Sequence, residues 1–179
     1  MNPLIAILLA LAVLVIGIIG YFTMFQTSSQ SANAQSAQQS VQAIFSTMSQ
    51  QFATNPNFTG LTVGGAAGAG VFPSTWVTGT APNQTVMDPW GGTVSLAPAG
   101  INGGTDNGWA LTIPNVPQAE CTQVASFYTP QTASISVNGT SVWSNPSYGG
   151  SSVGAPSPAA IQTACANPQN SIVWTVSGQ

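Results

Sequence analysis

Five side chains in this sequence of 179 residues could supply acid, metal-binding or thiol chemistry. They are the carboxylates Asp88, Asp106 and Glu120 and the thiols Cys121 and Cys165, and the chain has no Lys, Arg or His. General acid–base catalysis and metal binding need such groups close together, with His most often among them. Three carboxylates scattered along the sequence do not provide that pattern. We therefore expect no enzyme, no metal site and no cofactor.

The absence of basic residues also bears on partners. Proteins bind nucleic acids largely by neutralising phosphates with Lys and Arg, so we expect no nucleic-acid binding by this subunit alone. The formal net charge is only −3. Copies of a chain with so little charge repel one another weakly and tend to associate. That tendency would harm a free protein but suits a polymer.

Cys121 and Cys165 are the only cysteines, and the chain that carries them begins with a segment typical of exported proteins. An even cysteine count outside the cytoplasm predicts one disulfide. Closing a loop of forty-odd residues would stabilise the fold by about 3 to 4.5 kcal/mol. Two buried free thiols are the alternative.

A long apolar run extends from Leu4 to Phe25 and is interrupted by two glycines and one threonine. About 20 apolar residues cross a bilayer as a helix, so this length predicts a membrane segment. Neither a basic leader nor a basic flank accompanies it. Because signal sequences and membrane anchors normally carry such residues, we expect a subunit that has been processed and exported.

Residues 26–40 change abruptly to small and amide side chains, which suits either a flexible linker or a helix. The next segment favours the helix, because five apolar residues follow at the spacing of one helical face: Val41, Ile44, Phe45, Met48 and Phe52. We expect them to pack the helix on a globular domain. The predicted organisation is one long helix over 1–53, with 1–25 as the membrane or filament-core part and 26–53 as the amphipathic part, followed by a globular domain over 54–179.

Short strands and short helices alternate in the predicted globular domain. The strands are rich in Val, Ile, Thr and Trp, and Asn138-Gly139 indicates a tight hairpin between two of them. The glycine-rich stretch 60–70 predicts an irregular surface loop. The fold class is α+β, with an antiparallel sheet. The expected strands cover 74–78, 92–97, 109–113, 133–137, 141–143 and 171–176, and the expected helices cover 117–124 and 157–161.

These features together resemble the type IV pilins, and among them the type IVb group of toxin-coregulated, bundle-forming and conjugative thin-pilus pilins. The likeness rests on the N-terminal helix beginning Met1-Asn2-Pro3-Leu4-Ile5, its amphipathic continuation, and the strand Trp109–Ile113 leading to Cys121. It rests also on a second cysteine before a last strand, and on the turn Asp88-Pro89-Trp90-Gly91-Gly92. The likeness covers most of the chain in order and spacing.

The resemblance implies a precursor that a prepilin peptidase cleaves, with N-methylation of Met1. The inner membrane would hold the subunit until the pilus assembly machinery extracts it into a helical homo-oligomer outside the cell. Gly17 and Gly20 lie near where helices of this family loosen, although small residues also allow close helix packing. The residues expected to line the filament core are Leu4, Ile5, Ile7, Leu8, Leu11, Val15, Ile18, Ile19, Phe22 and Phe25.

One position departs from the family pattern. Members typically have a glutamate at the fifth mature residue, where this chain has Ile5. Either the chain is a minor pilin, or packing alone sets the register of its filament. The leading hypothesis is a structural pilus subunit that polymerises through its apolar helix. The alternatives are a membrane-anchored surface or periplasmic binding module that does not polymerise, a pseudopilin, and an archaeal-type pilin.

Overall fold

The computed structural model describes residues 32–53, 57–81, 83–152 and 154–178. The chain divides into two units, Met1–Asn33 and Ala34–Gln179. Residues 1–31, which include the apolar run, lie outside the described residues. The unit Ala34–Gln179 is called the head below. Among the described residues, no helix has the length and the apolar character needed to cross a bilayer.

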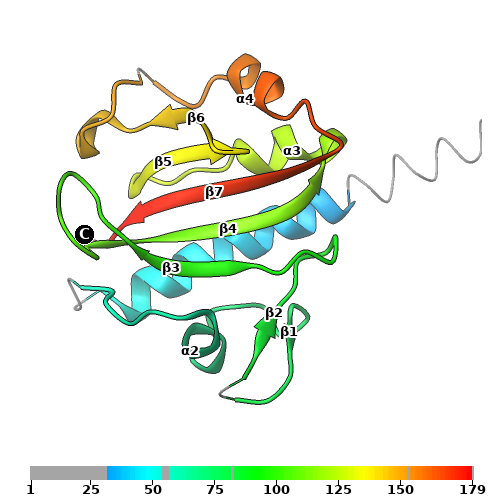
Figure 1. The fold of residues 1–179 in the computed structure, drawn as a ribbon, viewed down its shortest axis with the longest axis vertical. Coiled ribbons are helices and arrows are strands. Elements are labelled where there is room, and N and C mark those ends of the chain that lie inside the picture. The colour runs from blue at the N-terminus through cyan, green and yellow to red at the C-terminus, as the bar shows by residue number, and fades with distance from the viewer. Residues whose placement is uncertain (1–31, 54–56, 82, 153, 179) are drawn as a thin grey trace, which may run out of the picture. The chain divides into compact units, whose positions relative to one another are not determined.

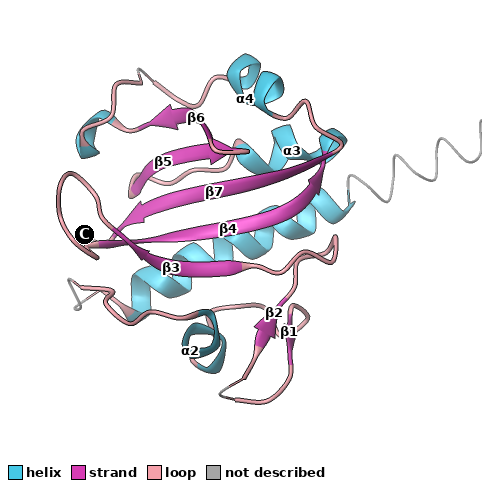
Figure 2. Ribbon diagram, in the orientation of Figure 1, coloured by secondary structure: helices cyan, strands magenta, loops and turns pink. Residues whose placement is uncertain are grey.

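A five-stranded antiparallel sheet forms the centre of the head (Figures 1 and 2). Its strand order is β3-β4-β7-β5-β6. The last strand in the sequence, β7, therefore lies in the middle of the sheet and pairs with both β4 and β5. The strands are β3 (Ser95–Ala99), β4 (Gly108–Pro117), β5 (Thr132–Val137), β6 (Thr140–Ser144) and β7 (Gln169–Ser177).

Alternation along the central strands separates a buried face from a partly exposed one. On β7, Ile172, Trp174 and Val176 are buried, while the residues between them are partly exposed. The register places Trp174 opposite Leu111 on β4 and opposite Ile135 on β5. Since alternate side chains of a strand point to opposite faces, this register gathers the large apolar residues on one face.

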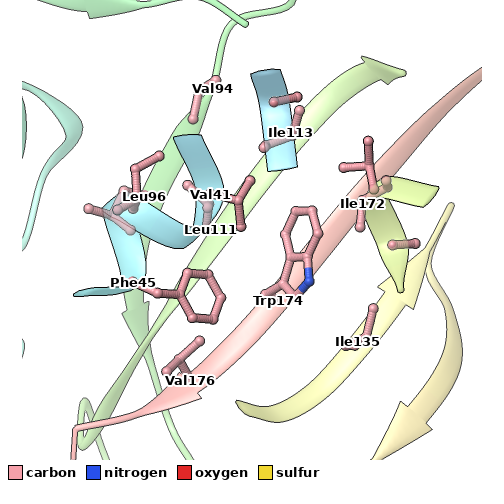
Figure 3. Packing of buried hydrophobic residues seen from close by; sticks show 14 of the residues in the cluster. Val41, Phe45, Val94, Leu96, Leu111, Ile113, Ile135, Ile172, Trp174 and Val176 are labelled. Atoms are coloured by element: carbon pink, nitrogen blue, oxygen red, sulfur yellow. The ribbon is translucent and has the colours of Figure 1, made fainter. Parts of the chain in front are cut away.

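The long helix, residues 32–51, covers the buried face of the sheet (Figure 2). The ring of Phe45 meets Trp109 of β4 edge-on at a centroid distance of 4.9 Å and meets Phe127 at 5.3 Å. Figure 3 shows Val41 and Phe45 on the helix facing Leu111, Trp174 and the other core residues of the sheet. The amphipathic segment thus completes the core of the head.

Two further helices flank the sheet. Helix α3 (Gln118–Ala125) follows β4 directly, and α4 (Pro158–Ala164) precedes β7. The sequence placed Pro117 in the first turn of this helix. In the structure Pro117 is the N-cap of α3 and the last residue of β4. The β5–β6 hairpin turns at Asn138 and Gly139, which have φ of 53° and 78°. Positive φ at both positions is what a type I′ turn requires, as the Asn-Gly pair predicts.

One expectation for this part of the chain is wrong. The glycine-rich stretch 60–70 contains a short helix, α2 (Val63–Gly68), which the hydroxyl of Thr62 caps by accepting from Gly65 N–H. Ala66 and Ala67 are buried in the core. Their packing on the head offsets the weak helix propensity of the glycines. A two-stranded hairpin of β1 (Val77–Thr78) and β2 (Thr85–Val86) follows. β1 is shorter than the strand expected over 74–78, and no strand was expected at β2.

Candidate functional site

The helix–sheet contact is the first part of the candidate site, because it fixes the long helix to the head. Val41, Ile44, Phe45 and Met48 are each at most 3% exposed, and Phe52 is partly buried against the same core. Ala34 and Ala37 extend the buried face toward the start of the helix. The exposed positions between them are mainly Gln and Ser. The helix therefore presents a polar, uncharged face on the side away from the sheet.

Cys121 and Cys165 form a disulfide with their Cα atoms 5.8 Å apart, which confirms the predicted pair. Cys121 belongs to α3 and Cys165 is the C-cap of α4. Both side chains are buried. The two cysteines are 44 residues apart in sequence, and their bridge links α3 to the end of α4. It therefore fastens α4, and through it the start of β7, to the middle of the head.

A polar turn that the sequence marked only as a motif is closed by several hydrogen bonds. In the 87–92 turn, Asp88 Oδ1 accepts the backbone N–H groups of Trp90 at 2.9 Å and of Gly92 at 2.8 Å. The main chain closes the turn, since Asp88 N–H donates to Gly92 O and Met87 N–H donates to Trp76 O. Hydrogen bonds within the turn and one to Trp76, just ahead of β1, thus hold the turn in place.

The indole of Trp90 ties the 87–92 turn to helix α3. Its Nε1–H donates to Oε2 of Glu120 at 3.0 Å. Glu120 is only 3% exposed and is the neighbour of the disulfide-bonded Cys121. Burial raises the pKa of the Glu120 carboxyl above its ordinary value, and the hydrogen bond from Trp90 partly opposes that rise.

Asp88 is also a buried acid, at 5% exposed. Burial raises its pKa, and the hydrogen bonds from Gly92 and Trp90 oppose the rise. Its second oxygen, Oδ2, is buried without a hydrogen-bond partner among the described residues. The turn leaves no room for a side chain at Gly92, because a Cβ there would lie 2.6 Å from this oxygen and 2.7 Å from Pro114 Cγ.

Between the long helix and the loop that joins α3 to β5 lies a groove of about 330 Å³, here called the Tyr128 groove. The exposed helix residues Gln42, Ser46 and Ser49 form one wall. Phe127, Tyr128 and Pro130 contribute to the other wall. Tyr128 is 42% exposed, and its ring is supported by Trp143 at a centroid distance of 5.3 Å. No charged residue lines the groove.

The remaining residues singled out from the sequence lie outside the described part of the chain. These are Met1, the glycines Gly17 and Gly20, and the expected filament-core residues Leu4, Ile5, Ile7, Leu8, Leu11, Val15, Ile18, Ile19, Phe22 and Phe25. Within the described residues, no group of three His, Cys, Asp or Glu side chains could hold a metal ion.

Two features were not found by sequence reasoning. The link between Trp90 and Glu120 joins residues 30 positions apart, so no local pattern could indicate it. The Tyr128 groove is likewise formed by segments far apart in sequence. The sequence did offer a signal for the 87–92 turn itself. Asp88 stands ahead of Pro-Trp-Gly-Gly, and an Asp in a turn commonly accepts backbone N–H groups of that turn.

Comparison with known proteins gives one family and several similar folds. The family described as PilS N terminal matches residues 31–177. The crystal structure of the type IV b pilin from Salmonella typhi has a TM-score of 0.54 at 17% identity, covering 84% of this chain and 99% of that chain. TcpA, a type IV pilin from Vibrio cholerae El Tor biotype, has a TM-score of 0.56 at 13% identity, covering 82% and 99%. No curated protein matches the chain.

Proposed function

Because the chain belongs to the PilS N-terminal family and has the type IVb pilin fold, we propose that it is the structural subunit of an extracellular pilus. Its family and fold are those of structural subunits rather than of enzymes. In this proposal the subunit polymerises through its N-terminal helix. The inner membrane holds it before assembly, a prepilin peptidase processes it, and the pilus assembly machinery extracts it.

The observation that carries this proposal is the one-sided packing of the long helix. Its buried face, from Ala34 to Met48, lies on the sheet, and the sequence upstream of that helix is the apolar run 4–25. An apolar helix is equally well surrounded by lipid and by other apolar helices. Such a segment could therefore leave the membrane for a bundle of its own copies without exposing apolar surface to water.

The proposal assigns roles to the residues outside the described region. The apolar residues of the run, Leu4 and Ile5 among them, fill the filament core. Ile5 packs against its neighbours there, in place of the contact that a glutamate at this position would make with an N-terminal amine. Met1 carries the N-methyl group. Gly17 and Gly20 let the helix loosen during assembly, since glycine weakens a helix by about 1 kcal/mol relative to alanine.

The test is to isolate filaments from cells that carry the assembly machinery and to identify their bulk protein by mass spectrometry. We expect this chain, with an intact mass that includes one methyl group. Leu11→Lys places a charge in the apolar run and should abolish filaments. Gln50→Lys, on the exposed face of the long helix, is the matched control and should leave them intact. Discrete monomers in detergent and no fibres from the wild-type chain would favour the anchored binding module instead.

A further inference from the structure

Two large apolar side chains stand out on the described surface of the head. Met87 is 39% exposed and Tyr128 is 42% exposed, and they are the exposed large hydrophobic residues of the described part of the chain. Single apolar residues on a surface are ordinary. These two differ in their support, because the backbone of Met87 belongs to the hydrogen-bonded 87–92 turn and the ring of Tyr128 packs beside Trp143.

The two residues lie at opposite corners of the sheet. Met87 bridges to Thr93, just ahead of the edge strand β3, whereas Tyr128 lies just ahead of β5. Strands β4 and β7 separate β3 from β5, which is about 14 Å at the usual strand spacing. They also lie toward opposite ends of the strands, because Ser95 pairs with Thr112 and Thr132 pairs with Val176. Contact between them within one head is therefore excluded.

A head-to-tail contact between identical subunits joins two different surfaces of the subunit. Met87 and the Tyr128 groove are two such surfaces at separate places on the head. A contact between unlike patches that does not close into a ring generates an open helical filament. Met87 is an exposed, unbranched side chain, and the Tyr128 groove is a hollow of about 330 Å³ with one wall that carries Phe127 and Tyr128. Thioether sulfur packs favourably against aromatic rings. Since no charge lines the groove, a methionine could enter it without desolvating an ion.

We propose that Met87 of one subunit inserts into the Tyr128 groove of the next subunit in the filament. This inference rests on the proposed function, and it adds a specific contact between heads to the bundle of apolar helices. The buried acids Asp88 and Glu120 support this contact, because their hydrogen bonds hold the backbone of the 87–92 turn that carries Met87. A preorganised backbone segment loses less conformational entropy on binding.

The experiment uses the full chain in cells with its assembly machinery, and filaments are counted by negative-stain microscopy. Met87→Glu places a carboxylate in a groove that offers it no positive charge and should lower the filament count at least tenfold. Met87→Leu keeps an apolar side chain and should preserve filaments. Ser46→Lys, on the exposed wall of the groove, should restore filaments when it is combined with Met87→Glu, because the new charges would pair.

A folding control accompanies each variant. The membrane-held subunit should reach wild-type abundance and should retain the Cys121–Cys165 disulfide on non-reducing gels. As a second measurement, the Met87→Cys/Ser46→Cys variant should give a ladder of disulfide-linked subunits in isolated filaments. Neither single cysteine variant should give a ladder, and peptide mapping should identify the linkage between positions 87 and 46.

The outcomes separate the two proposals. No filaments from the wild-type chain, under conditions in which another type IV pilin assembles, would overturn the pilus-subunit proposal and the contact with it. Wild-type filaments together with undiminished filaments from Met87→Glu would overturn only the contact. Loss of filaments that Ser46→Lys does not restore, without a cysteine ladder, would also overturn the assignment of the groove as the site that receives Met87.

Discussion

The indole N–H of Trp90 donates to a carboxylate oxygen of Glu120 at 3.0 Å, which joins the 87–92 turn to the disulfide-bonded helix α3. Both ends of this link are buried or partly buried. The turn, α3 and, through the disulfide, α4 thus form one connected polar and covalent frame along the head. Four predictions follow from the residues of this frame.

Replacing Trp90 should destabilise the head. Among the described residues Trp90 is the one donor to Glu120 Oε2, so Trp90→Phe leaves a buried acceptor unpaired, which costs about 1 to 3 kcal/mol. The free energy of unfolding, measured by denaturant titration of the full chain in neutral detergent, should fall by that amount. Trp143→Phe is the control. Its indole donates to the backbone carbonyl of Gly154, which is neutral, so the loss should be smaller.

Stability should decrease as the pH rises from acidic to neutral values. The pKa values of Asp88 and Glu120 are raised in the folded chain, so the folded state binds protons more tightly than the unfolded state. Their contribution is therefore most favourable below the ordinary carboxyl pKa values and is lost as the pH passes upward through the raised values. Melting temperatures of the full chain between about pH 3 and 8 would show this trend.

The same pH series has an internal control. Glu120→Gln keeps an oxygen that can accept from Trp90 but cannot ionise, and Asp88→Asn does the same for the N–H groups of the turn. The double variant should show a flatter melting profile than the wild type. If the wild-type head instead lost stability on acidification to pH 4, the raised pKa values would not govern its pH response.

Removing the disulfide should lower the free energy of unfolding by about 2 to 5 kcal/mol. Cys121→Ala, Cys165→Ala and the double variant should be nearly equivalent, because each abolishes the same 44-residue crosslink. Reducing the wild-type chain with dithiothreitol should give a similar loss in the same denaturant titration. Losses in the single variants that add up in the double variant would contradict a role for the crosslink itself.

Gly92 should tolerate no larger residue. In Gly92→Ala the new Cβ would lie 2.6 Å from Asp88 Oδ2 and 2.7 Å from Pro114 Cγ, so the turn must shift. Such overpacking costs about 1 to 3 kcal/mol. Gly68→Ala is the matched control, because its Cβ would meet nothing closer than 3.6 Å and alanine favours the helix α2. Thermal unfolding should separate the two variants clearly.

Local sequence patterns predicted the parts of the fold that depend on local periodicity. The 3.6-residue spacing from Val41 to Met48 and the alternation from Ile172 to Val176 both correspond to buried faces in the structure. Asn138-Gly139 predicted its hairpin because few residues adopt positive φ easily. Each of these signals is contained within a few neighbouring residues.

What the sequence did not predict depends on contacts made at a distance. Helix α2 was missed because burial of Ala66 and Ala67, rather than intrinsic propensity, stabilises it. The partner of Glu120 and the walls of the Tyr128 groove are brought together only by the folded sheet. Local patterns also could not give the strand order, since residues 118–168 lie between the paired strands β4 and β7.

The central place of β7 determines when the head can fold. Both neighbours of β7 depend on it, because β4 and β5 do not pair with each other but are joined through this strand. β7 follows the other four strands in the sequence, so β3–β4 and β5–β6 remain two separate pairs during synthesis until residue 177 has been made. The two halves of the sheet are therefore joined only by this last strand, and the crosslink between Cys121 and Cys165 lies just ahead of it in the sequence.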